Sequence, residues 1–449
     1  MHSETVRPHL LYVAWGFPPS RGGGVYRALA TANAFSEAGW RVTVLTVERE
    51  TFLFTTGIDA SLESHIDPSV RVVRIPYDVA SIQHDLRRWS WIRARFTELW
   101  NVVRVARNLS SFPEPASGAW RHTLESVALS IHDDDPVDLV VGTTNPFIDF
   151  APGLALKKKR GVPYVMDYRD AWQLNVFTGA RTKKPWSNVA RWERALVKSA
   201  HEIWFVNEPI KQWHADLYPH SAKRMRVVMN GFDRRLAHFS DRVRDRRDEG
   251  LVFGYIGTIS PEVPMRQLLA GWKLAREESQ LIAESRLQIF GYLGHTGQLA
   301  SELTQLLESQ AQHGVSYDGP VEKSEIVATY ATFDALLLVI GPGNYVTSGK
   351  VFEYAASGIP IVSIHDQRSG ASRVLTGHPA WVSAADLTAR GVADALLVGA
   401  ALALEQTREQ RAHVQVWAEH LARENQLRPR IEALASVVHT QNPAGSAQT

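Results

Sequence analysis

The stretch 347–362 (TSGKVFEYAASGIPIV) combines a glycine, a cation and a carboxylate at the start of a predicted helix. Ser348 and Gly349 stand where that helix is expected to begin, so their backbone amides would point towards a bound anion. Lys350 supplies a mobile positive charge that suits a diphosphate. Glu353 follows one turn later on the same side and can accept hydrogen bonds from a ribose. An i,i+3 salt bridge on an exposed helix would explain the charges but not the glycine at the entry.

Three consecutive glycines, Gly22, Gly23 and Gly24, follow the first apolar run and precede an amphipathic stretch that begins near Val25. Such a loop lets backbone amides approach an anion, and the helix start adds a partial positive charge. We interpret it as a phosphate-facing or sugar-facing loop, and the alternative is a flexible connection. It is not the dinucleotide-binding fingerprint, because Ala28 and its neighbour occupy the places of the third glycine.

The segment Asp167–Trp172 (DYRDAW) ends a predicted buried strand with a cluster of charges. Charged groups at such a place are costly unless they serve one another or a ligand. Arg169 could grip a phosphate, and Asp170 could orient a substrate hydroxyl. The alternative for Arg169 is a structural ion pair with Asp167 or Asp170.

Composition narrows the class of protein. The chain has 449 residues, 45% of them hydrophobic and 21% charged, as in globular proteins of two or three domains. Its 49 basic and 47 acidic residues favour no nucleic-acid partner. The absence of cysteine excludes disulfides, thiolate metal sites and a cysteine nucleophile, and the scattered histidines predict no metal site. With no secretion signal and no long apolar window, we expect a cytoplasmic protein without a membrane span.

The elements that must position these residues form two series of short apolar runs separated by helical patterns. Continuous Val/Ile/Leu runs favour parallel strands that are covered on both faces. The predicted strands are His9–Trp15, Arg41–Val47, Val70–Ile75, Val137–Gly142, Val162–Tyr168, Ile203–Val206 and Arg226–Met229, then Leu251–Gly257, Leu287–Phe290, Val315–Asp318, Ala335–Ile340, Ile359–Ile364 and Ala380–Ser383.

This order predicts an α/β protein with two Rossmann-like, doubly wound domains facing a central cleft. The expected bounds are 1–233 for the N-terminal domain, 234–250 for a polar linker, 251–405 for the C-terminal domain, 406–438 for C-terminal helices and 439–449 for a disordered tail. Ligands bind at the carboxyl ends of such strands, where the three clusters above are found.

At these residues the chain resembles the family 4 retaining glycosyltransferases, which have the GT-B fold. The resemblance rests on the Gly22–Gly24 loop, Asn230–Asp233 (NGFD), Gly254–Gly257 (GYIG), the helix of Glu353 and its exit at Gly358–Pro360. It implies metal-independent transfer of a sugar from a nucleotide diphosphate sugar, which is a co-substrate, with no cofactor. The donor would bind mainly the C-terminal domain and a hydroxyl-bearing acceptor the N-terminal one. The C-terminal helices would cross back to the N-terminal domain.

The chain departs from this family at several positions. Tyr345 stands where many members have the first glutamate of a Glu-x7-Glu pair, and Thr258 and Val263 stand where an Arg and a Lys neutralise the diphosphate. Lys350 is our preferred replacement for that charge, with Arg266 and Arg169 as alternatives. Arg169 takes the place of a common histidine. The resulting catalytic candidates are Arg169, Asp170 and Lys350, and the donor-binding candidates are Gly22, Gly23, Gly24, Asn230, Gly257, Thr258, Arg266, Tyr345, Ser348, Gly349, Lys350 and Glu353.

The stretch Asp85–Arg107 has six arginines against two acidic residues, and its apolar residues recur at helical spacing. Our interpretation is a single N-domain helix that packs on the core or lines the acceptor pocket. The alternative is peripheral contact with an anionic membrane, at the inner face, which would suit a lipid-linked acceptor.

Two other functions fit the same architecture. A nucleotide-sugar epimerase would work without an acceptor. A non-catalytic two-domain solute-binding protein should carry an export signal and would not need the Ser348–Glu353 cluster. The sequence predicts neither the sugar, the nucleotide base, the acceptor nor the oligomeric state.

Overall fold

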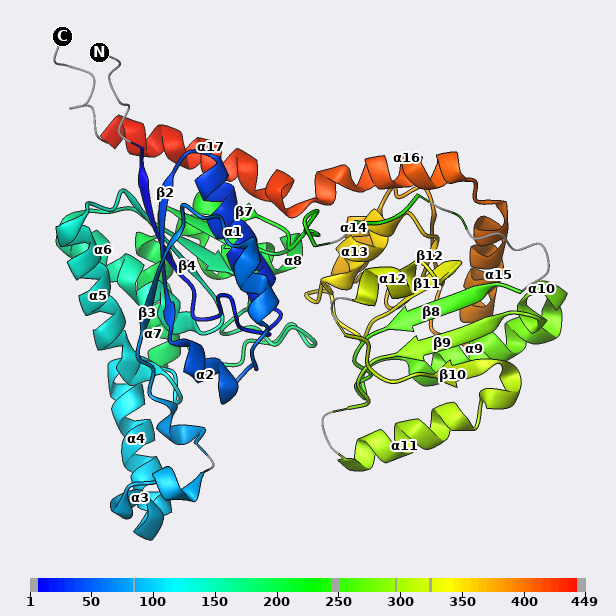
Figure 1. Cartoon of the computed structure of the whole chain (residues 1–449), viewed down its shortest axis with the longest axis horizontal. Helices are drawn as coiled ribbons and strands as arrows, with labels where there is room; N and C mark the ends of the chain where they lie inside the picture. Colours follow the sequence, from blue (N-terminus) through cyan, green and yellow to red (C-terminus); the bar gives the residue numbers. More distant parts are fainter. Residues whose placement is uncertain are drawn as a thin grey trace. The chain divides into compact units, whose positions relative to one another are not determined.

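The structure is a computed structural model, and it describes residues 7–83, 85–236, 238–241, 243, 250–294, 297–322 and 325–441. The chain divides into two compact units (Figure 1). Unit 1 comprises residues 1–175, 180–229 and 423–449, and unit 2 comprises residues 176–179 and 230–422.

Unit 1 contains a sheet of seven strands in the order β3-β2-β1-β4-β5-β6-β7. All neighbouring strands are parallel, and the sheet is buried along its central strands, as the continuous apolar runs predicted. The strands are β1 His9–Val13, β2 Arg41–Val47, β3 Arg71–Ile75, β4 Leu139–Thr143, β5 Tyr164–Tyr168, β6 Glu202–Phe205 and β7 Met225–Val227.

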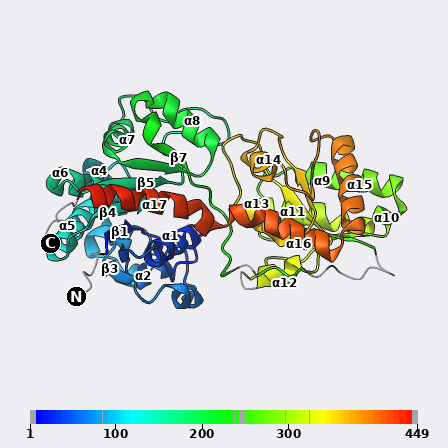
Figure 2. The ribbon, with the colours of Figure 1, turned by 90° about the horizontal axis from the view of Figure 1, so that it is seen from above.

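Helices cover both faces of this sheet. One face is lined by alternate residues such as Leu10 and Tyr12, and it packs against α1 and α17, which lie side by side in both views (Figures 1 and 2). The helix α6 packs against β4 and β5. The α-helices of unit 1 are α1 Val25–Glu37, α2 Arg49–Leu53, α3 Trp91–Arg95, α4 Thr97–Ser111, α5 Arg121–Asp134, α6 Ala151–Arg160, α7 Asn188–Ser199, α8 Glu208–Leu217 and α17 Arg423–Gln441.

Unit 2 contains a second parallel sheet, of six strands in the order β10-β9-β8-β11-β12-β13. Its strands are β8 Val252–Ile256, β9 Arg286–Phe290, β10 Val315–Tyr317, β11 Ala335–Val339, β12 Ile361–Ile364 and β13 Trp381–Ser383. Its α-helices are α9 Met265–Glu278, α10 Gln280–Ala283, α11 Gly297–Glu308, α12 Ile326–Tyr330, α13 Lys350–Ser357, α14 Gly370–Leu375, α15 Ala389–Glu405 and α16 Arg408–Ala418.

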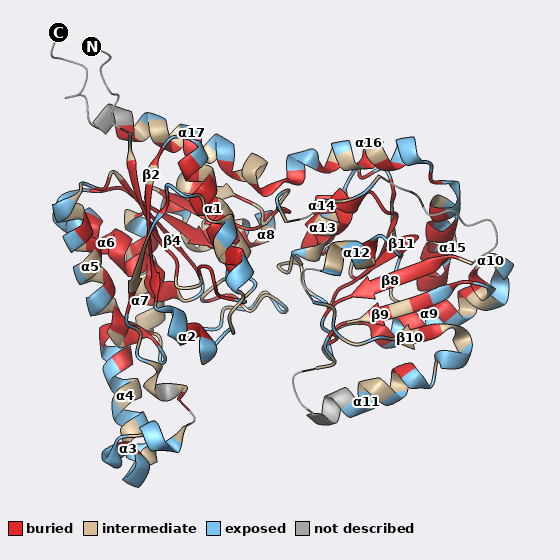
Figure 3. Cartoon of the chain, in the orientation of Figure 1, coloured by how far each residue is buried: buried red, intermediate tan, exposed pale blue. Residues whose placement is uncertain are grey.

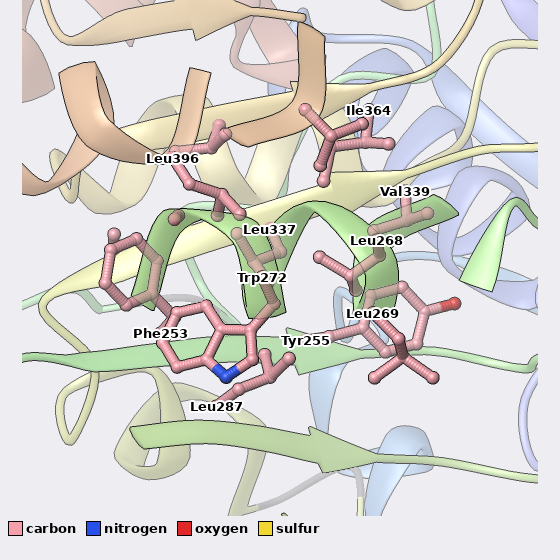
Figure 4. Packing of buried hydrophobic residues seen from close by; sticks show 14 of the residues in the cluster. Phe253, Tyr255, Leu268, Leu269, Trp272, Leu287, Leu337, Val339, Ile364 and Leu396 are labelled. Atoms are coloured by element: carbon pink, nitrogen blue, oxygen red, sulfur yellow. The ribbon is translucent and has the colours of Figure 1, made fainter. Parts of the chain in front are cut away.

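The core of unit 2 lies between its sheet and the helices α9 and α15 (Figures 3 and 4). Trp272 on α9 is fully buried and packs edge-on against Phe253 of β8, with ring centroids 5.3 Å apart. Because burial of such aromatic side chains dominates core energetics, this layer holds β8 and β11 in fixed positions.

The α/β prediction with two Rossmann-like, doubly wound sheets is confirmed. Each sheet reverses its strand order once, between β1 and β4 in unit 1 and between β8 and β11 in unit 2. Loops at the carboxyl ends of such strands are where this class of fold binds ligands.

Two details of the sequence analysis are wrong. The stretch Asp85–Arg107 is not one helix: a 3-10 turn at Leu86–Arg88, α3 and α4 follow one another, because Ser90 caps α3 and Phe96 adopts a non-helical conformation. The tail does not begin at residue 439 as predicted, since α17 continues to Gln441. Residues 442–449, and residues 237, 242 and 244–249 of the predicted linker, lie outside the described residues.

Candidate functional site

In unit 2, Lys350 and Gly257 meet at the reversal point of the sheet. Gly257 follows β8, and Lys350 is the first residue of α13, which packs against β11. A Cβ atom at position 257 would overlap the Lys350 Nζ and the Tyr255 hydroxyl. The Lys350 Nζ also lies 5.7 Å from the centroid of the Tyr255 ring. The glycine therefore makes room for the ammonium group at this edge of the sheet.

Glu353 lies one turn along α13 and is half-buried. The hydroxyl of Tyr330 donates to the Glu353 Oε2 at 3.1 Å. Burial, together with the nearby Glu353 carboxylate, raises the pKa of Tyr330 well above its usual value, so this phenol stays a donor at neutral pH. The contact holds the Glu353 Oε2 in place on the first turn of α13.

The start of α13 is built from Ser348 and Gly349. The Lys350 amide donates to the Ser348 Oγ at 3.4 Å, and the amides of Val351 and Phe352 donate to the carbonyls of Ser348 and Gly349, at 3.2 and 3.3 Å. The positive end of the helix dipole lies at this helix start, and the Lys350 ammonium lies on its first residue. The structure therefore brings the Lys350 ammonium to Gly257, and Ser348, Gly349 and Glu353 lie within one helical turn of Lys350 along the chain.

The remaining donor-binding candidates are more dispersed. Thr258 is exposed, and its carbonyl accepts from the Tyr255 hydroxyl at 3.3 Å. Arg266 is exposed on the first turn of α9. A ring carbon of Tyr345 would lie 3.0 Å from a Cβ at Gly179, a residue of the same unit. Asn230 stands on the connection from β7 to unit 2, not on a loop that follows a strand of the unit 2 sheet.

In unit 1, the structure brings the glycine loop and Arg169 together. A Cβ atom at Gly24 would overlap the Arg169 guanidinium, so Gly24 makes room for this cation at the start of α1. The other two glycines differ: the Gly22 carbonyl accepts from the Val25 amide at 2.9 Å, while a Cβ atom at Gly23 would meet nothing within 4 Å.

Asp170 lies beside Arg169 in a loop that is held by Thr144. The Thr144 hydroxyl accepts from the amides of both residues, at 2.9 and 3.0 Å. The Asn145 side chain donates to the Asp170 Oδ2 at 2.9 Å, and the Arg169 Nη2 lies 3.5 Å from the same oxygen. Half of the Asp170 side chain is exposed, which leaves the carboxylate accessible to a ligand.

Asp167 does not pair with Arg169, so that part of the structural alternative is wrong. The Asp167 side chain is fully buried, and Arg27 binds its carboxylate with two nitrogens. Arg27 also donates to the carbonyls of Val228 and Met229, at 3.1 and 3.0 Å. Arg27 was not predicted as a site residue; the signal that could have indicated it is a cation within the apolar pattern of α1.

A buried network fixes the loop that follows β5. The Glu193 carboxylate on α7 is fully buried and accepts from the hydroxyls of Tyr168 and Tyr218 and from the Gln173 amide. The Tyr168 hydroxyl in turn accepts from the Trp172 amide at 3.0 Å. These contacts position the residues next to Arg169 and Asp170. No local pattern pointed to them, since they lie tens of residues apart.

A second buried carboxyl, Asp149, was also missed. Its Oδ2 accepts from the Trp15 amide at 2.7 Å, and burial raises its pKa well above the usual value. Burial therefore favours the neutral form of the Asp149 carboxyl, which lies behind the loop that follows β1.

Two absences hold for the part of the chain that the structure describes. It contains no group of three or more His, Asp or Glu side chains that could hold a metal ion. In the same part, every helix is too short or too polar to cross a bilayer.

Comparison with known proteins identifies the N-terminal part. Residues 22–231 match a family model described as a glycosyl transferase 4-like domain, which begins at the glycine loop and extends through β7. No curated protein sequence matches the chain.

Solved structures match over nearly the whole length. Sucrose-phosphate synthase from Thermosynechococcus elongatus is 15% identical, with a TM-score of 0.61 over 96% of this chain and 100% of that one. HepE from Anabaena, in complex with UDP-glucose, is 14% identical, with a TM-score of 0.57 over 95% and 99%. A protein described as a putative UDP-N-acetylglucosamine 2-epimerase from Listeria monocytogenes is 9% identical, with a TM-score of 0.54 over 97% of both chains. At these identities the likeness shows the fold.

Proposed function

Because this chain is a glycosyltransferase of the GT-B fold, with a glycosyl transferase 4-like domain at residues 22–231, we propose that it is a retaining, metal-independent enzyme. It moves a sugar from a nucleotide diphosphate sugar to a hydroxyl of a glycan, lipid-linked or secondary-metabolite acceptor. The observation that carries the proposal is the meeting of Lys350, Gly257 and the start of α13 at the reversal point of the unit 2 sheet.

Unit 2 binds the donor in this proposal. The diphosphate lies at the start of α13, where the Lys350 ammonium, the positive end of the helix dipole and the amides of Ser348 and Gly349 neutralise its charge. The Glu353 carboxylate, held by Tyr330, accepts hydrogen bonds from the ribose hydroxyls. HepE, a neighbour in fold, is described in complex with UDP-glucose, which supports a nucleotide sugar as donor.

Unit 1 acts on the acceptor. Asp170 is fixed by Asn145 and by the Thr144 hydroxyl, and it orients the attacking hydroxyl. Arg169, supported by Gly24, supplies a positive charge at the same loop.

The reaction breaks the bond between the anomeric carbon and the donor's terminal phosphate oxygen, and it forms a bond from that carbon to the acceptor oxygen. Lys350 and the helix amides stabilise the charge that develops on the leaving phosphate oxygens. The acceptor attacks from the face that the diphosphate leaves, which needs close positioning more than a strong base. The acceptor proton goes to a phosphate oxygen of the leaving group. Lys350 and the helix amides neutralise the leaving diphosphate, which is the task that a metal ion would otherwise perform.

The decisive experiment measures the melting temperature of the protein with UDP, GDP, ADP and dTDP, with and without EDTA. One nucleoside diphosphate should raise it, because at about 100-fold above Kd a ligand stabilises the folded state by about 2.7 kcal/mol. The shift should persist in EDTA and shrink in Lys350→Ala and in Glu353→Ala. Unchanged nucleotide affinity and donor turnover in both variants would contradict the assignment.

Products of donor-only incubation separate this function from that of an epimerase, with which the chain shares its fold. A transferase leaves the intact donor's sugar configuration unchanged and consumes the donor faster when an acceptor is added. An epimerase produces the epimeric nucleotide sugar without any acceptor.

A further inference from the structure

The apolar face of helix α4 in unit 1 points towards solvent, and its polar face points inwards. Leu99, Val102 and Val103 occur at the spacing of one helix face, and they are 63%, 65% and 60% exposed. The opposite face carries Arg104, which is half-buried, and Asn108, which is buried. A helix that stabilises a water-soluble domain points its apolar face inwards, so folding of unit 1 does not explain this arrangement.

The apolar surface extends from α4 onto α3. Trp91 and Ile92 are 74% and 59% exposed, and the Trp91 ring packs edge-on against that of the exposed Phe96. Figure 3 colours α3 and the outer face of α4 as exposed. More than half of the exposed large apolar side chains in the described part of the chain lie between Leu86 and Leu109. We call Trp91, Ile92, Phe96, Leu99, Val102 and Val103 the α3–α4 surface.

Arginines border the α3–α4 surface. Arg95 and Arg107 are exposed, and neither has an acidic partner among the described residues. Arg87 and Arg88 lie just before α3, and within the described part of the chain Asp85 is the acidic partner of both. An exposed apolar face with a positive border is typical of helices that lie in the headgroup region of an anionic bilayer.

Two cavities lie beside the inner face of α4, which also packs against the turn at Gly118–Trp120. One cavity of about 380 Å³ is lined by residues that include Trp89, Arg93 and Trp100. A second, of about 320 Å³, is lined by residues that include Arg104 and Arg107. The Arg104 Nε is buried with no hydrogen-bond partner among the described residues. Because buried polar groups are normally paired, this cation is suited to a phosphate that reaches the cavity.

We propose that the α3–α4 surface docks onto an anionic phospholipid bilayer, with Trp91, Leu99 and their apolar neighbours in the interface and the bordering arginines on lipid phosphates. This role is additional to sugar transfer and does not depend on it. A second copy of the chain is disfavoured as occupant, because a symmetric contact through this surface would bring equivalent arginines towards one another.

Vesicle co-sedimentation of the full chain tests the proposal. The wild type should bind vesicles of phosphatidylcholine with phosphatidylglycerol and not vesicles of phosphatidylcholine alone. The variant Leu99→Gln/Val102→Gln/Val103→Gln should lower the partition coefficient about tenfold or more, since each side chain loses apolar area buried in the interface. Arg95→Gln and Arg107→Gln should each lower it about fivefold.

The matched control is Val398→Gln/Leu404→Gln/Val416→Gln, which removes three exposed apolar side chains of unit 2. Its partition coefficient and the melting temperature of every variant should equal those of the wild type. Absence of binding, equal binding to neutral vesicles or an equal loss in the control overturns the proposal. A change from dimer to monomer in the α4 variant, measured by light scattering without vesicles, assigns the surface to a second copy and also overturns it.

The absence of cysteine permits a direct second readout. An environment-sensitive dye on Leu99→Cys should shift its emission to the blue with anionic vesicles, whereas the same dye on Val398→Cys should not. Equal shifts at both positions, or none at either, contradict docking through α4.

Discussion

The Lys350 ammonium rests against Gly257, so close that a Cβ atom at position 257 would overlap it. The two residues are separated by much of unit 2 in sequence, and they meet because β8 and β11 are neighbours in the sheet. The absence of a side chain after β8 therefore determines where the cation of α13 lies.

The first prediction is that Gly257→Ala weakens donor binding about tenfold or more, because the displaced Lys350 loses charge-assisted hydrogen bonds to the diphosphate. Calorimetric titration with the nucleoside diphosphate found in the thermal-shift panel measures this. Gly16→Ala is the control, since a Cβ there meets nothing within 4 Å. Unchanged affinity in Gly257→Ala would show that the position of Lys350 does not matter for the donor.

The second prediction concerns Gly24, whose backbone φ of −72° allows any residue. Gly24→Ala should lower kcat about tenfold by displacing Arg169, while the nucleotide affinity of unit 2 stays unchanged. Arg169→Lys should have a similar effect, because a lysine cannot reproduce the planar, forked guanidinium. Steady-state kinetics with saturating donor tests both; a selective rise in donor KM would place Arg169 on the donor instead.

The third prediction is for the buried pair of Arg27 and Asp167. Arg27→Met should lower the free energy of unfolding by about 3–5 kcal/mol, because it leaves an unpaired buried carboxylate. The double variant Arg27→Met/Asp167→Leu should regain much of this loss, since it removes both charges. Urea unfolding measures the cycle, and additive losses in the double variant would contradict the coupling.

The fourth prediction is a pH dependence of stability. His378 is buried between Ala355 and Trp417, and its Nδ1 accepts from the Ala380 amide at 3.2 Å. Burial lowers its pKa from 6.5 to about 4. Between these values the unfolded chain binds a proton that the folded chain does not, so stability falls as the pH falls below 6.5.

Between pH 7.5 and pH 5, the protonation of His378 in the unfolded chain should lower the free energy of unfolding by about 2 kcal/mol. In His378→Gln the free energy of unfolding should fall by that much less over the same pH range. Urea unfolding of the wild type and the variant at the two pH values measures the difference. Other buried histidines, such as His9 and His365, contribute equally to both proteins and cancel. Parallel pH profiles would refute the assignment.

The sheets could be predicted from sequence because each strand is a local pattern. Runs such as Arg41–Val47 are buried on both faces, so their composition alone distinguishes them, and each predicted strand is found with ends that shift by a residue or two. The cluster of Ser348, Lys350 and Glu353 was equally local, since one helix start contains all three.

Long-range partners could not be predicted. Arg27 and Asp167 are 140 residues apart, and Glu193 meets Tyr168 and Tyr218 only in the folded unit. The sequence also could not predict whether the apolar residues of α3 and α4 face the core or the outside of unit 1. An apolar stripe has the same spacing in both cases.

The helix α17 has a consequence for the order in which the chain folds. Leu427, Ile431 and Leu434 complete the apolar layer of unit 1, yet the ribosome makes them after all of Asn230–Ala422. At a synthesis rate of about 5–20 residues per second, translation of Asn230–Ala422 takes roughly 10–40 s, and during this time Leu10 and Tyr12 lack their contacts with α17. Throughout that interval α1 covers only part of this face, and the apolar area that α17 will cover stays exposed to water. Chaperone binding and aggregation during synthesis should therefore concentrate on that area.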